Sequence, residues 1–172
     1  INNLAGKEQY KEVLQRMRAL NHKWLIESRD VGFMPEAMMV EITKTTPLYD
    51  YARSGKYDVE KIVEAAEISS SKDPTALPAI QEMLTDKDPI VRYWGVIGCT
   101  VLSRHARSST ARLKELLQDR EISVRIAAAE ALYIQGEKEQ PLKTLVAALK
   151  SDNLMARVQA LNVLVVMGDD GR

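Results

Sequence analysis

Apolar residues recur at three- and four-residue intervals near the start of the chain. This spacing places them on one helical face and predicts a long amphipathic helix over residues 7–28. The apolar stripe consists of Tyr10, Val13, Leu14, Met17, Leu20, Trp24 and Leu25. An isolated helix of this length is marginal in water. We therefore expect the stripe to pack against something larger than the helix itself.

The helical period fails between residues 29 and 57. Gly32, Pro35, Pro47 and Gly55 interrupt this stretch, as is typical of an irregular connector. Within it, Thr46 and Pro47 suit the start of a short helix over residues 48–53. The connector is the expected domain boundary, with residues 1–57 on one side and residues 58–172 on the other.

A repeated unit follows the connector, after a helix expected at residues 59–70. Arg92, Arg125 and Arg157 recur at spacings of 33 and 32 residues, each after a polar turn. Each turn separates two apolar helical segments, expected at 75–84 with 89–103, 110–118 with 123–134, and 141–150 with 154–167. Such a period predicts an all-α solenoid, an α-α superhelix preceded by the long amphipathic helix and the connector.

The C-terminal part resembles HEAT repeats of the armadillo-like class. In that family, the second helix opens with an acidic or amide residue and carries an arginine a few positions later. The matching pairs are Asp88 with Arg92, Glu121 with Arg125, and Asn153 with Arg157. The resemblance implies a structural ladder along the stacked repeats, in which each partly exposed pair contributes roughly 0.2–1 kcal/mol. Asn153 departs from the acidic pattern, so the last rung is expected to be weaker.

A second resemblance spans about residues 10–66. The stretch Trp24-Leu25-Ile26-Glu27-Ser28-Arg29-Asp30-Val31-Gly32-Phe33-Met34-Pro35-Glu36 resembles the end of the catalytic domain in bacterial heparan-type sulfatases, which are N-sulfoglucosamine sulfohydrolase-like. The segment Thr46-Pro47-Leu48-Tyr49-Asp50-Tyr51-Ala52-Arg53 resembles the part that leads into their helical repeats.

The resemblance implies a periplasmic or extracellular parent chain that hydrolyses sulfate esters or sulfamates. The family uses a formylglycine, made from Cys or Ser in Cys/Ser-x-Pro-x-Arg, and a calcium ion. The segment from Cys99 to Arg104 lacks the proline and has its arginine one place late. We expect Cys99 to be a small core thiol. No catalytic, cofactor-binding or metal-binding residue is therefore assigned, and the calcium and formylglycine belong to the parent by resemblance only.

Composition bears on three further kinds of function, namely nucleic-acid binding, membrane spanning and zinc binding. Lys plus Arg and Asp plus Glu both number 24 among 172 residues, so the formal net charge is zero. A neutral chain has no surplus field to hold nucleic acid nonspecifically. No apolar run approaches the roughly 18 residues that cross a bilayer. His22 and His105 are the only histidines, and neither has a second ligand at helical spacing, which disfavours a zinc site.

Arg104, Arg107 and Arg112 form the densest basic cluster, in the loop between the first two repeats. Several guanidinium groups together can hold a sulfated or phosphorylated partner. A solvated loop is the favoured interpretation, and the anion contact is the alternative.

The leading hypothesis is a non-catalytic C-terminal piece of a sulfatase-like enzyme, whose partner is the N-terminal catalytic domain of the same chain. The solenoid would brace that domain, shape substrate access or mediate assembly. The alternative is a stand-alone HEAT-repeat scaffold that binds a protein partner on its concave face. Neither the oligomeric state nor the parent's substrate follows from the sequence.

Overall fold

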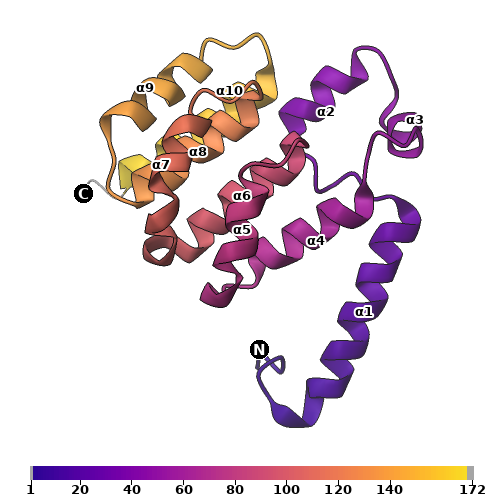
Figure 1. Ribbon diagram of the computed structural model, residues 1–172. Coiled ribbons are helices and arrows are strands. Elements are labelled where there is room, and N and C mark those ends of the chain that lie inside the picture. The colour runs from indigo at the N-terminus through magenta and orange to yellow at the C-terminus, as the bar shows by residue number, and fades with distance from the viewer. Residues whose placement is uncertain (1, 170–172) are drawn as a thin grey trace.

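The computed structural model describes residues 2–169 and is entirely helical over that range, with no strand (Figure 1). The all-α prediction is therefore confirmed for the described residues. The α-helices are α1 (Lys11–Ser28), α2 (Glu36–Thr43), α3 (Leu48–Arg53), α4 (Val59–Ser70), α5 (Leu77–Met83), α6 (Pro89–Leu102), α7 (Thr110–Leu116), α8 (Ile122–Ile134), α9 (Glu139–Ala148) and α10 (Leu154–Asp169). Three 3₁₀ helices, η1 (Glu8–Tyr10), η2 (Pro74–Ala76) and η3 (Ser103–Ser109), precede α1, α5 and α7.

Helices α4, α6, α8 and α10 pack against one another in that order. The shorter helices α5, α7 and α9 each pack against the longer helix that follows them in the chain. Each short helix and its successor therefore form a pair, and three such pairs follow α4. The pairs coincide with the repeated units of the sequence.

Side-chain caps start several of the long helices. The carboxylate of Asp58 accepts a hydrogen bond from the Lys61 backbone N–H at 3.2 Å, and that of Asp88 accepts one from Ile90 at 2.8 Å. Each cap satisfies a backbone donor that has no partner within its helix. At the other end of α8, Gly136 adopts a φ of 101°, which favours glycine. Gly168, 32 residues later, instead lies inside α10.

Small residues let α5 approach α6 closely. A Cβ built on Gly95 would lie 2.8 Å from the Cβ of Met83, and one on Gly98 would lie 2.9 Å from Cδ1 of Ile80. A side chain at Gly95 would also meet the Leu84 backbone N at 3.1 Å, so this glycine is needed for the packing distance, whereas at Gly98 the Ile80 side chain would have to shift.

The connector shares one hydrophobic core with the helix pairs. Its contribution to that core comes from Met34, Ala37, Met38, Ala52 and Tyr57, all of which are buried. Helix α2 packs against α10 and α8, far from its own place in the chain. Residues on both sides of the expected boundary at 57/58 are thus packed together.

Helix α1 extends away from the other helices and contacts α4 near its own C-terminal end (Figure 1). Leu25 is the buried residue of this helix. Among residues 2–169, no helix has both the length and the apolar character that crossing a membrane requires.

Candidate functional site

The recurring arginine closes the turn that precedes its own helix. One guanidinium nitrogen, NH1, donates to the carbonyl oxygen six residues earlier in each repeat. The acceptors are Asp86 at 2.8 Å from Arg92, Asp119 at 2.6 Å from Arg125, and Ser151 at 2.7 Å from Arg157. The sequence period therefore reports a turn-closing contact made once in each helix pair.

Arg92 also forms an ion pair, and its partner is Asp119 rather than Asp88. Arg92 Nε donates to Asp119 Oδ2 at 2.7 Å, and NH2 donates to Oδ1 at 2.8 Å. The two side chains are only 8% and 6% exposed. Asp119 lies in the turn of the next helix pair, so the ion pair joins successive pairs.

The pKa values of this ion pair follow from its hydrogen bonds. The hydrogen bond to Asp119 raises the pKa of Arg92 above its ordinary value, although burial opposes this. Burial by itself would raise the pKa of Asp119, but hydrogen bonds from Arg92 and from the Glu121 backbone N–H lower it. Both groups are therefore held in their charged forms.

A second ion pair of the same kind joins α4 to the first helix pair. Lys61 Nζ donates to Asp86 Oδ2 at 2.6 Å, and Asp86 stands where Asp119 stands one repeat later. We call this series of contacts the inter-pair ladder. The sequence signal for these contacts is an acidic residue two positions before the residue that precedes α6 and α8, namely Asp86 and Asp119.

The residues expected to partner the arginines lie at helix starts. Asp88 caps α6, whereas Glu121 precedes α8 without a capping hydrogen bond from its side chain. Asn153 caps α10, and its Nδ2 donates to Ala37 O at 2.8 Å and Glu41 Oε1 at 2.9 Å. Asn153 therefore ties α2 of the connector to α10.

The stretch from Trp24 to Glu36 forms the joint between α1 and the helix pairs. Arg29 ends α1 in the left-handed region, with a φ of 55°. Asp30 then accepts a hydrogen bond from the Gly32 N–H at 2.7 Å through its carboxylate and one from the Tyr57 hydroxyl at 2.7 Å through its carbonyl. Trp94 of α6 donates its indole N–H to Phe33 O at 2.9 Å. These bonds anchor the joint to the core.

Leu25 of the apolar stripe is buried, but most of the stripe faces away from the other helices. Met17, Leu20 and Trp24 are 61%, 60% and 59% exposed. On the opposite face, His22 Nδ1 lies 3.0 Å from the carboxylate of Glu67 in α4. We define Val13, Met17, Leu20 and Trp24, together with Tyr10 at the end of η1, as the outer stripe of α1.

Cys99 is fully buried in α6. Burial raises the pKa of its thiol to about 11, although a hydrogen bond with Ser109 opposes this. A thiol with this pKa is almost entirely protonated at neutral pH and is a poor nucleophile. Within residues 2–169, no three His, Cys, Asp or Glu side chains cluster in a way that could hold a metal ion.

The basic cluster divides into two parts. Arg104 and Arg107 are exposed on η3. Arg112 instead donates to Leu84 O at 3.0 Å and pairs with Glu115. An anion contact at Arg104, Arg107 and Arg112 stays a prediction, with the Arg112 guanidinium already engaged by a carboxylate.

Over the described residues, these observations define an all-helical protein in which a buried ion pair joins the first two helix pairs, and in which the first helix exposes a stripe of apolar side chains. Comparisons of the chain with protein-family models, with curated proteins and with solved structures found no match.

Proposed function

We propose that this chain is a non-catalytic HEAT-type solenoid module that braces a neighbouring catalytic domain through the outer stripe of α1. The serial packing of α4, α6, α8 and α10 supports the solenoid architecture. The turn-closing arginines support it as well, because the same contact recurs in each helix pair. Stacked repeats of this kind are extended and leave broad surfaces for other domains.

The outer stripe of α1 is the observation that carries the proposal. Its residues follow one another at intervals of three, four, three and four positions, the spacing of a seam that packs against another helix. Large apolar side chains left in water at this spacing mark an interaction surface. Burial would stabilise the contact by roughly 25 cal/mol per Å² of apolar surface removed from water.

We infer the class of the neighbouring domain from the sequence resemblance to sulfatases. In those enzymes, a long amphipathic helix closes the catalytic domain and ends in the stretch that forms the joint here. The hydrogen bonds of Asp30 and Phe33 give that stretch a physical role, which is to fix the direction of α1 relative to the repeats. The parent enzyme would hydrolyse sulfate esters or sulfamates, with its formylglycine and calcium outside this chain.

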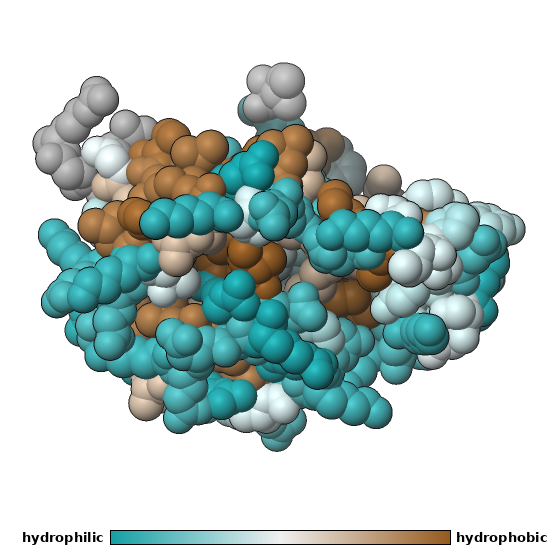
Figure 2. All heavy atoms as spheres, turned by 90° about the horizontal axis from the view of Figure 1, so that it is seen from above, coloured by the Kyte–Doolittle hydropathy of each residue, from teal (hydrophilic) through white to brown (hydrophobic). Residues whose placement is uncertain are grey.

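A stand-alone scaffold that binds a protein partner is the second candidate, and the outer face of α10 favours it. Leu154, Val158, Leu161 and Val165 are all exposed. Val158 occupies the repeat position of Ile126, which is fully buried one repeat earlier. Figure 2 shows apolar side chains gathered at the upper left of the view, the side on which α10 lies in Figure 1.

The coding DNA upstream of Ile1 separates the two candidates. If the chain braces a catalytic domain, we expect the DNA upstream of Ile1 to continue the open reading frame and to encode a Cys/Ser-x-Pro-x-Arg segment. A start codon close to Ile1, with no such segment, would refute it and favour the scaffold.

A paired substitution then tests the surface in the protein encoded by the whole reading frame. Leu20→Glu is expected to lower the unfolding temperature of the catalytic domain, because a carboxylate would enter the apolar contact. Arg16→Gln, on the flank of the same helix, serves as the matched control and should leave it unchanged. Equal behaviour of the two variants would show that the outer stripe does not contact that domain.

A further inference from the structure

The inter-pair ladder is interrupted at Arg125. Lys61 pairs with Asp86 and Arg92 pairs with Asp119, but the corresponding position for Arg125 is occupied by Ser151, 32 residues after Asp119. Ser151 Oγ accepts the turn hydrogen bond from the Asn153 N–H at 3.2 Å. The carboxylates of Asp86 and Asp119 accept the equivalent bonds. Serine thus replaces the turn acceptor but supplies no negative charge.

Arg125 is nevertheless held as Arg92 is. Its NH1 donates to the carbonyl oxygens of Asp119 and Arg120, at 2.6 and 3.1 Å. In Arg92, these turn contacts leave the edge formed by Nε and NH2 for the carboxylate of Asp119. Among the side chains that the structure describes, no carboxylate lies within ion-pair distance of Arg125, so the corresponding edge has no anionic partner there.

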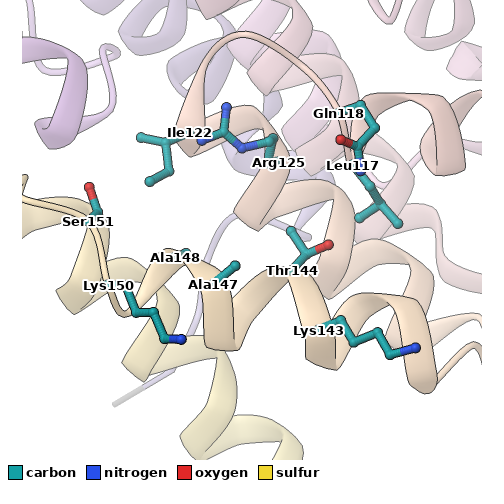
Figure 3. A pocket seen from close by; sticks show the side chains of 10 residues that line it. All are labelled: Leu117, Gln118, Ile122, Arg125, Lys143, Thr144, Ala147, Ala148, Lys150 and Ser151. Atoms are coloured by element: carbon teal, nitrogen blue, oxygen red, sulfur yellow. The ribbon is translucent and has the colours of Figure 1, made fainter.

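A pocket of about 450 Å³ lies beside this guanidinium. Figure 3 shows Arg125 of α8 on one side of the pocket, with its guanidinium turned toward Ile122, and Thr144, Lys143 and Lys150 on the other side, from α9 and the turn after it. No carboxylate lines the pocket, whereas Arg125, Lys143 and Lys150 all do. Lys143 also pairs with Glu139 at 2.6 Å, which leaves Arg125 and Lys150 as the lining cations without a carboxylate partner in the described structure.

We propose that Arg125 and the pocket beside it bind a doubly charged oxyanion, sulfate or phosphate, in the place that an aspartate carboxylate takes in the preceding rungs. Two oxygens of such an anion accept from Nε and NH2 of Arg125, as Asp119 accepts from Arg92. The Arg–oxyanion fork is a strong, directional arrangement. Lys150 adds positive charge at the rim of the pocket, which favours a dianion over acetate. This proposal does not depend on the proposed bracing function.

Titration of the chain with sodium sulfate, inorganic phosphate and sodium acetate tests the proposal, with sodium chloride of matched ionic strength as the blank. The readout is the NMR signal of the Arg125 Nε–H. Sulfate and phosphate are expected to shift it saturably and acetate to bind more weakly, while chloride should leave it in place.

Two variants remove the site in different ways. Arg125→Gln removes the guanidinium, so its anion binding is followed through backbone signals of Ser151 and Thr144. Ser151→Asp supplies the missing carboxylate, which should accept hydrogen bonds from Nε and NH2 of Arg125 and so exclude the oxyanion. Both are expected to weaken sulfate binding by about tenfold or more, a difference of about 1.4 kcal/mol. Circular dichroism verifies folding, and Ser151→Asp keeps the test valid if Arg125→Gln does not fold.

Lys143→Gln is the matched control for general loss of positive charge, because Lys143 already pairs with Glu139. It should weaken sulfate binding far less than Arg125→Gln does. The proposal is overturned if sulfate causes no saturable shift, if Ser151→Asp binds sulfate as the unmodified chain does, or if all three variants weaken binding equally.

Discussion

Arg92 and Asp119 form a bidentate ion pair between two successive helix pairs, with donor–acceptor distances of 2.7 and 2.8 Å. The contact joins residues from different repeats and is almost fully buried. A buried ion pair is costly to break because the remaining charge loses its partner while it stays out of water. We therefore expect single substitutions in the ladder to change the free energy of unfolding by different amounts, according to how deeply the ion pair is buried.

Asp119→Ala is expected to destabilise the chain by about 3–5 kcal/mol, because it leaves the Arg92 guanidinium buried without its carboxylate. Asp86→Ala is the matched comparison. It removes an equivalent turn acceptor, but its partner Lys61 is 39% exposed, so the expected loss is about 1 kcal/mol. Urea unfolding measures both. Equal losses would show that burial of the cation does not control the energetics.

Ser151→Asp is expected to stabilise the chain by roughly 0.2–1 kcal/mol, since it places a carboxylate opposite Arg125. A negative charge near the start of α10 could stabilise that helix independently. A double-mutant cycle with Arg125→Gln separates the two effects in urea unfolding. The same gain in both backgrounds would rule out an ion pair with Arg125.

Glu130 makes stability depend on pH. Burial in α8 raises the pKa of its carboxyl above the ordinary value of 4.5. Below pH 4.5 the group is largely protonated in both states and costs nothing. As pH rises through the folded-state pKa, the unfolded state has already released its proton, so stability is lost.

Glu130→Gln should therefore match the unmodified chain near pH 4 and become the more stable of the two as pH rises toward 7. Chemical unfolding of both proteins across this range measures the difference. A difference that does not change with pH would show that Glu130 titrates normally in the folded state.

Gly95→Ala is expected to destabilise the chain by about 1–3 kcal/mol, because the new Cβ would overlap Met83 and approach the Leu84 backbone N. Helix propensity by itself favours alanine over glycine by about 1 kcal/mol. Gly168→Ala, where nothing lies within 4 Å, should show that gain or no change. Thermal unfolding of the two variants compares them. A stabilised Gly95→Ala would mean that α5 can move away from α6.

Cys99 is expected to react with a thiol reagent only when the chain unfolds, because it is buried and its thiol pKa is raised to about 11. Labelling at pH 8 should be slow in buffer and fast in urea, and its rate should track unfolding. Complete labelling of the folded protein within the mixing time would contradict this.

Local features of the fold were predictable because they depend on residues close together in the chain. The helix at 48–53 was predicted from Thr46 and Pro47, although Pro47 itself precedes the helix and no side chain caps it. The start of α4 followed from the capping chemistry of Asp58. Recurrence of Arg92, Arg125 and Arg157 located the turns, since each arginine contacts the turn just before its own helix. Because each contact is local, it recurs in the sequence at the same spacing as the helix pairs.

The ladder partner was not predictable in the same way. Asp88 is the nearer acidic residue to Arg92 in sequence, yet Asp119 is the one that stacking brings to it. Likewise, nothing in the local pattern of Asn153 indicates that it would donate to Ala37 and Glu41 of α2. The direction of the α1 stripe was also decided by tertiary structure, because the hydrogen bonds at the joint set which face meets α4.

The sequence by itself determined that this chain is helical, where most of its helices begin and end, and that a unit of two helices recurs. Tertiary structure decided which charges pair, how the connector docks on α8 and α10, and where Arg125 is left without a carboxylate. The physical reason is the distance in sequence over which each interaction acts. Helical period and capping depend on residues only a few positions apart. Ion pairing between repeats depends on how whole helices stack.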